Sequence, residues 1–128
     1  MDLKRILITG KHSYVGTNVS NWLMKEPENY NVESISVRDD GWKSFDFSKF
    51  DVVFHLAAQS LVKTSYEQPA LTFTTNSIGT LNILETIRLI NRKCKVILVT
   101  SDKSYKNLEI RRGYKETDLI GGEDPYSA

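Results

Sequence analysis

Short runs of β-branched and apolar residues alternate with stretches of helical periodicity along this chain of 128 residues. The runs predict four strands, at Arg5–Thr9, Val32–Val37, Asp51–Leu56 and Cys94–Thr100. The third run is almost continuously apolar, which is typical of a strand covered on both faces. The pattern therefore predicts an α/β fold with a doubly wound parallel sheet, truncated after about four strands.

The segments between the strands differ in length and character. A first helix is expected from apolar residues at helical spacing, namely Val15, Val19, Trp22 and Leu23. A longer helix after Pro69 is expected to bury one stripe, formed by Leu71, Ile78, Leu81, Leu84, Ile87 and Ile90. Only about a dozen residues join the second strand to the third, so Trp42–Phe50 should cross without a full helix. The polar segment 106–123 predicts a surface loop at the ligand edge.

Composition restricts the partners and the compartment. Seventeen Lys and Arg residues balance sixteen Asp and Glu residues, a formal net charge of +1, so no strongly basic surface indicates nucleic acid or an anionic membrane. The single Cys94 excludes an internal disulfide and fits a reducing compartment. The residues before the first strand are too few for a signal or spanning segment, so a cytoplasmic protein of one domain is expected.

A glycine-bearing turn, TGKHSYVG at residues 9–16, joins the first strand to the first helix. In a Rossmann-like dinucleotide fold, Gly10 would form the tight turn and Gly16 would let the helix pack closely on the sheet. Ser13 would lie beside the pyrophosphate in place of the usual middle glycine, and Tyr14 and Val15 would open the helix toward it. The alternative is an ordinary strand-to-helix turn.

The residues after the second strand are candidates for the adenosine end of a dinucleotide. Arg38 and Asp39 stand side by side, which leaves NAD and NADP both open, and a solvated turn explains the two charges equally well. Asp46 and Phe47 would contact the adenine, the carboxylate accepting from its amino group. Alternatively, the rings of Phe47 and Phe50 fill the core of the bare crossover.

Three stretches together carry a family resemblance: the glycine turn, the run from Asp51 to Gln59, and the helix entry from Asn76 to Asn82. They resemble the extended short-chain dehydrogenase/reductase superfamily, whose members are largely NAD-dependent nucleotide-sugar epimerases and dehydratases. From about Asp51 the chain resembles the CDP-glucose 4,6-dehydratases in four strings: HLAAQ at 55–59, SYEQP at 65–69, TSDKSY at 100–105 and GGEDPYS at 121–127. Residues 1–50 resemble a shortened epimerase-type N-terminus, which permits a divergent homologue or a recombined sequence.

The resemblance assigns cofactor contacts to the end of the third strand and to the helix entry, at Leu56, Ala57, Ala58, Gln59 and Asn76. Small residues let the backbone approach a ligand, although Ala57 and Ala58 would be equally at home in simple packing. His55 precedes this edge of the sheet. We therefore expect it to be buried with a hydrogen-bond partner rather than to be a catalyst.

The resemblance also implies the chemistry, in which bound NAD⁺ takes hydride from C4 of the sugar, water leaves across C5 and C6, and the hydride returns at C6. Tyr126 would take the 4-hydroxyl proton, aided by a lysine that the family carries one helical turn later. Ser101 would hydrogen-bond the 4-oxygen, Asp102 would protonate the departing 6-hydroxyl, and Lys103 would occupy the position of the base at C5. The alternative for this string is a Ser-Asp turn with a solvated lysine.

We therefore expect the cofactor-binding part of a nucleotide-sugar dehydratase, a lyase, without its substrate domain and inactive as the isolated chain. The expected cofactor is NAD, with NADP open, and the expected substrate of the parent enzyme is CDP-glucose, converted to its 4-keto-6-deoxy product. Self-association into a homo-oligomer is open, and no metal is expected. The alternatives are a 4-epimerase or reductase of the same superfamily, or a non-catalytic dinucleotide-binding module.

Overall fold

The structure is a computed structural model that describes residues 2–38 and 40–128. The single unit expected from the chain length divides into two compact units. The first comprises Met1–Ala58 and Thr80–Val99, and the second comprises Gln59–Gly79 and Thr100–Ala128. We describe each unit separately.

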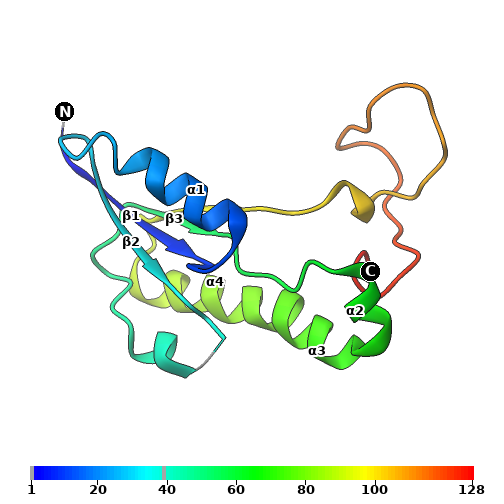
Figure 1. Ribbon diagram of the computed structural model, residues 1–128, viewed down its shortest axis with the longest axis horizontal. Coiled ribbons are helices and arrows are strands. Elements are labelled where there is room, and N and C mark those ends of the chain that lie inside the picture. Colours follow the sequence, from blue (N-terminus) through cyan, green and yellow to red (C-terminus); the bar gives the residue numbers. More distant parts are fainter. Residues whose placement is uncertain (1, 39) are drawn as a thin grey trace. The chain divides into compact units, whose positions relative to one another are not determined.

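The first unit contains the predicted parallel sheet (Figure 1). Its strands are β1 (Lys4–Thr9), β2 (Tyr30–Ile35), β3 (Val52–His55) and β4 (Lys95–Leu98), in the order β2-β1-β3-β4. All three pairings are parallel, and Ile6 of β1 lies beside Val32 of β2 and Val52 of β3. This arrangement confirms the predicted α/β, Rossmann-like fold. β2 begins and ends two residues earlier than the sequence pattern indicates.

Helices cover the sheet on opposite faces, α1 (Tyr14–Leu23) on one and α4 (Gly79–Ile90) on the other (Figure 1). Successive side chains of a strand point to opposite faces, so the residues of β1 divide between two clusters. Ile6 and Ile8 pack with Leu23 of α1. Leu7 joins the cluster that includes Ile83 and Ile87 of α4.

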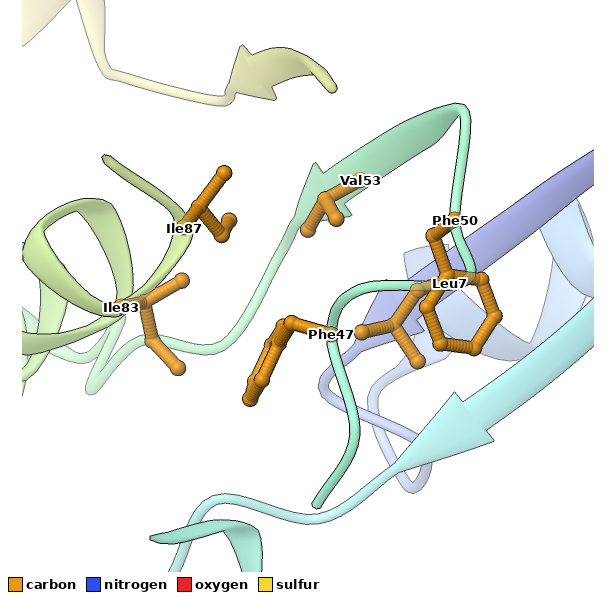
Figure 2. Close-up of a cluster of buried hydrophobic side chains, with 6 residues drawn as sticks. All are labelled: Leu7, Phe47, Phe50, Val53, Ile83 and Ile87. Carbon is orange, nitrogen blue, oxygen red and sulfur yellow. The ribbon is translucent and has the colours of Figure 1, made fainter. Parts of the chain in front are cut away.

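The short crossover between β2 and β3 buries aromatic rings in place of a full helix (Figure 2). It contains one 3₁₀ turn, η1 (Asp40–Ser44), followed by Phe47 and Phe50, which are 1% and 2% exposed. The Phe45 ring lies 5.5 Å from Phe47, edge to face, and 5.7 Å from Phe50, stacked. The predicted bare crossover is therefore confirmed. The ring of Phe47 fills the core, so it does not lie over an adenine.

The second unit holds short elements, and two of them, α3 and η2, lie within the long helix expected after Pro69. Its first segment carries α2 (Val62–Glu67), α3 (Pro69–Phe73) and a π-helical turn, η2 (Thr74–Ile78). Its second segment carries a 3₁₀ turn, η3 (Asp102–Ser104), and an isolated antiparallel bridge between Tyr105 and Ile120. Over the described residues, no helix is long and apolar enough to cross a membrane.

The apolar stripe predicted for the long helix is wrong in most of its members. Leu71, Ile78, Leu81 and Ile90 are 48–58% exposed, whereas Thr72 and Ile83 are buried. The π turn η2 rotates the side chains that follow it relative to Leu71. Within α4, the three-residue spacing of Leu81, Leu84 and Ile87 drifts away from one face of a helix with 3.6 residues per turn. A single period of 3.6 residues cannot describe both sides of such a turn.

The apolar run of β4 is largely exposed. Ile97, Leu98 and Val99 are 43%, 39% and 60% exposed. β4 lies at the edge of the sheet and is hydrogen-bonded to β3 alone. A run of apolar residues indicates a strand but does not distinguish a central strand from an edge strand.

Asn91, just after α4, ties the aromatic crossover to the helix end. Its Nδ2 donates to the backbone oxygens of Ser48 at 3.1 Å and Phe50 at 2.9 Å, with a longer contact to that of Phe47 at 3.4 Å. One amide therefore serves carbonyl groups that the irregular crossover leaves without sheet or helix partners.

We predict that Asn91→Ala lowers the free energy of unfolding by about 1–2 kcal/mol, because it removes the donor from these carbonyl groups. Urea unfolding followed by circular dichroism measures the change. Asn82→Ala, at an exposed position of α4, is the matched control and should stay within about 0.5 kcal/mol of the parent chain. Equal losses in the two variants would contradict the assignment.

Candidate functional site

The glycine turn follows β1 and passes close to the end of β3. Gly10 has a φ of +89°, which side-chain-bearing residues rarely adopt, and a Cβ there would lie 3.0 Å from the carbonyl carbon of Leu56. A Cβ at Gly16 would lie 2.5 Å from the backbone oxygen of Gly10. Both glycines are therefore required by close approach of the backbone. Gly16 approaches the Gly10 backbone within the turn, and not the sheet as the sequence predicted.

Ser13, which replaces the middle glycine, is the N-cap of α1. Its Oγ accepts a hydrogen bond from the Gly16 N–H at 2.9 Å. Tyr14 and Val15 open the helix, and amides in a first turn have no partner inside their own helix. These free amides, with the helix dipole behind them, suit the negative oxygens of a pyrophosphate. The turn therefore fits the phosphates of a dinucleotide.

A cavity of about 300 Å³ lies beside the glycine turn and the end of β2. It is lined by Lys11, His12, Ser34, Ile35, Ser36, Trp42 and Phe45. The N–H groups of Gly10 and Lys11 both donate to the Ile35 oxygen at 3.1 Å, which fixes the turn against β2. None of these lining residues was predicted as a site residue from the sequence, although Lys11 and His12 lie inside the glycine turn.

Arg38 and Asp46, predicted for the adenosine end, are not among the residues that line this cavity, and their cofactor contacts stay predictions. Arg38 is exposed and does not line this cavity, and Asp39 lies outside the described residues. Asp46 is exposed and accepts from the Ser48 hydroxyl at 2.6 Å and the Ser48 N–H at 2.9 Å, and these hydrogen bonds lower the pKa of its carboxyl. Asp46 therefore stays ionised and shapes its own turn.

His55 is buried at the end of β3, as expected. Its Nδ1 lies 2.8 Å from Thr9 Oγ1, and its Nε2 lies 3.1 Å from Thr80 Oγ1. The Ala57 N–H also donates to Thr9 Oγ1, at 3.4 Å. Burial lowers the pKa of His55, so the neutral ring joins β1, β3 and α4.

The Asn76 side chain and the Gln59 backbone form two reciprocal hydrogen bonds within the second unit. The Gln59 N–H donates to Asn76 Oδ1 at 2.8 Å, and Asn76 Nδ2 donates back to the Gln59 oxygen at 2.9 Å. Asn76 belongs to the π turn η2, a feature that frequently occurs at functional sites. Its amide holds the Gln59 backbone in place. We read it as a positioning residue, with any cofactor contact of Ala58, Gln59 and Asn76 remaining a prediction.

The candidate catalytic string follows β4 and is held by local hydrogen bonds. Ser101 caps η3, its Oγ accepting from the Lys103 N–H at 3.2 Å, and Asp102 is exposed. Lys103 Nζ lies 3.8 Å from Asp124 Oδ2. The other Asp124 oxygen accepts from the N–H of Tyr126 at 2.9 Å, which fixes the segment that carries the tyrosine.

A second cavity of about 340 Å³ joins the two candidate strings. It is lined by Asp102, Lys103, Tyr105, Asn107, Tyr114, Gly121, Glu123, Asp124 and Ser127. Ser101 and Tyr126 are adjacent in sequence to lining residues but are not themselves among them. The sequence predicted a loop at the ligand edge, but its polar residues Asn107 and Glu123 were not predicted to line a site.

The loop over this cavity has a fixed internal structure. The rings of Tyr105 and Tyr114 stack with centroids 5.2 Å apart. Arg112 and Asp118 form a bidentate pair with two contacts of 2.7 Å, and these hydrogen bonds lower the pKa of Asp118 to about 2. The loop therefore has a defined conformation where it lines the cavity.

Lys103 faces a negative group. Its side chain is 52% exposed, and its Nζ lies 3.8 Å from Asp124 Oδ2. A lysine that acts as a base requires the opposite surroundings, burial or positive neighbours. In this structure Lys103 is therefore arranged as a positive charge at the cavity.

The sequence of this chain is similar to those of known nucleotide-sugar dehydratases. The family model described as GDP-mannose 4,6 dehydratase matches residues 17–128. CDP-glucose 4,6-dehydratase of Salmonella typhimurium is 36% identical over an alignment that covers 97% of this chain and 42% of that protein. This chain therefore spans less than half the length of that relative.

Solved structures share the fold at lower identity. RMD of Pseudomonas aeruginosa, solved with NADPH, has a TM-score of 0.82 at 23% identity and covers 97% of this chain and 44% of its own. UDP-glucuronic acid 4-epimerase of Bacillus cereus, solved with NAD as a Y149F mutant, has a TM-score of 0.81 at 23% identity, covering 96% of this chain and 48% of its own.

We predict that stability falls as the pH decreases from about 7 to about 5. The pKa of His55 is lowered from 6.5 in the folded state, so the unfolded state binds more protons once the pH falls below 6.5. The free energy of unfolding should decrease by at most about 1.4 kcal/mol per pH unit for this one proton. Urea titrations at several pH values measure the slope.

The chain's two histidines provide a matched pair for this test. His55→Gln should be less stable at pH 7 and should show a shallower slope in this window. His12→Gln, at an exposed position, should retain the slope of the parent chain. A parent-like slope in His55→Gln would show that another group is responsible.

Proposed function

The chain belongs to the GDP-mannose 4,6 dehydratase family, within the NAD-dependent epimerase/dehydratase superfamily, and from this membership we propose that it is the NAD(P)-binding portion of a nucleotide-sugar 4,6-dehydratase. We further propose CDP-glucose as the substrate of the complete enzyme. The similarity to a CDP-glucose 4,6-dehydratase over 97% of this chain supports this choice.

One observation carries the proposal. The 3.8 Å contact between Lys103 and Asp124 joins two strings that lie far apart in the sequence. It brings the Ser-Asp-Lys string together with the Asp-Pro-Tyr string at one cavity of about 340 Å³. A reductase or epimerase needs a serine and a tyrosine, but an elimination also needs an acid and a cation or base beside them.

The residues have separate proposed duties toward the sugar. When bound, NAD(P)⁺ supplies an acceptor that takes a hydride and returns it. Ser101 would donate a hydrogen bond to the 4-oxygen, and Tyr126 would remove the proton from the 4-hydroxyl. Asp102, exposed at the cavity, would give a proton to the departing 6-hydroxyl. Lys103 would lie beside C5, where its positive charge favours transfer of the C5 proton to a water molecule.

The glycine turn would hold the cofactor's phosphates. Tyr14 and Val15 offer amides at the start of α1, and Gly10 lets the backbone approach without a side chain in the way. Leu56 and Ala57, next to Gly10, would border the same ligand from β3.

We predict that the chain binds NAD⁺ or NADP⁺ saturably and that Gly10→Ala weakens binding by at least about tenfold, because a Cβ at φ +89° displaces the turn. Isothermal titration calorimetry gives the dissociation constants. Gly113→Ala is the control, since a Cβ there meets nothing within 4 Å. Circular dichroism checks that both variants are folded, and Gly16→Ala provides a second variant of the turn. Absence of saturable binding to the parent chain would overturn the proposal.

Product analysis tests the reaction itself. A protein that carries this chain as part of a complete enzyme should convert CDP-glucose to a 4-keto-6-deoxy sugar nucleotide, detected by mass spectrometry as loss of one water. Asp102→Asn should slow this conversion by about 10²-fold, because it removes the proposed acid. An epimerised product of unchanged mass would contradict the dehydratase assignment.

A further inference from the structure

We propose that Asn107 binds the substrate, its side-chain Nδ2 donating a hydrogen bond to a sugar hydroxyl that takes no part in the reaction. The inference rests on the proposed function, since it concerns the sugar of that reaction. Asn107 lines the cavity of about 340 Å³ together with Asp102 and Lys103, to which we assign duties at C6 and C5. With Ser101 and Tyr126 acting at the 4-oxygen, the hydroxyls at C2 and C3 of glucose are left without a partner.

The oxygen of the Asn107 amide is already used within the loop. Oδ1 accepts from the Glu109 N–H at 3.1 Å and from the Tyr114 hydroxyl at 3.4 Å. Because a backbone N–H can only donate, its partner must be the amide oxygen, and this fixes which end of the amide is which. Within the part of the chain that the structure describes, Nδ2 makes no hydrogen bond. Its two N–H groups are therefore free to donate to a ligand.

The loop holds this amide in place before a ligand binds. The Tyr114 hydroxyl accepts from the Leu108 N–H at 2.9 Å, and the Tyr114 ring stacks on Tyr105 with centroids 5.2 Å apart. At the base of the loop, the Lys106 N–H donates to the Leu119 oxygen at 2.9 Å. A donor held in this way loses little side-chain freedom on binding, so more of its hydrogen bond contributes to affinity.

The neighbouring polar groups of the cavity are less suited to this contact. The Ser127 hydroxyl exchanges hydrogen bonds with the Asp124 backbone, at 3.2 and 3.3 Å. Glu123 carries a carboxylate, which only accepts hydrogen bonds when it is ionised, and we assign Lys103 to the reacting C5. The Asn107 amide donates without gaining or losing a proton, so it can hold a hydroxyl that must not react. A small number of such polar groups fixes the orientation of a ligand in a cavity.

Two substitutions at this position separate a substrate contact from a structural role. Asn107→Asp keeps the oxygen that accepts from Glu109 and Tyr114 but replaces the donor nitrogen with an acceptor, whereas Asn107→Ala removes both. In a complete enzyme that carries this chain, both variants should lower kcat/KM for CDP-glucose by at least about tenfold. Asn82→Ala, exposed on α4, is the matched control and should retain the parent value. A parent-like kcat/KM in Asn107→Asp would overturn the inference and leave the proposed function intact.

Deoxy analogues of the substrate identify the contact. CDP-2-deoxyglucose and CDP-3-deoxyglucose each lack one of the two candidate hydroxyls. The parent enzyme should use one of them at least about tenfold less efficiently than CDP-glucose, and Asn107→Ala should lose most of this discrimination. Discrimination that persists undiminished in Asn107→Ala would contradict a direct contact, provided that circular dichroism shows a folded variant. If the parent enzyme does not eliminate water from CDP-glucose, the proposed function and the inference both fall.

Discussion

The close approach of β1 and β3 at their carboxyl ends determines the rest of the first unit's ligand edge. Gly10 lies against the Leu56 backbone, and the His55 ring bridges Thr9 and Thr80 just below it. The glycine turn leaves from one of these strands and the small residues of HLAAQ leave from the other. A side chain at position 10 would push the glycine turn away from the Leu56 backbone.

The aromatic crossover has a consequence for the neighbouring cavity. A helix between β2 and β3 would place its own surface beside the β2 end. Here one 3₁₀ turn takes that position, and Trp42 and Phe45 come from the crossover to line the cavity. The buried rings of Phe47 and Phe50 replace the contacts that a helix would have made with the sheet. The short connection thus replaces a covering helix and also lines the cavity.

Periodicity was enough to predict the four strands, their parallel arrangement and the two covering helices, because these depend on which residues must leave water. It failed where local geometry changes the period, as at η2, and where burial depends on a strand's place in the sheet, as at β4. Lys11 and His12 could not be selected because the direction of side chains in a turn is set by hydrogen bonds such as those to Ile35. The pairing of Lys103 with Asp124 depends on the path of an irregular loop, and hydrophobic periodicity does not predict such a path.

Asp124 shows how narrowly one position can be specified. One oxygen accepts from the Tyr126 N–H, and the other faces the Lys103 ammonium group. Asparagine would keep the short acceptor but lose the charge, whereas glutamate would keep the charge but extend the acceptor away from the backbone that it holds. Only aspartate satisfies both demands, so a single exchange by either of its nearest chemical relatives separates the anchoring of the tyrosine segment from the neutralisation of the lysine.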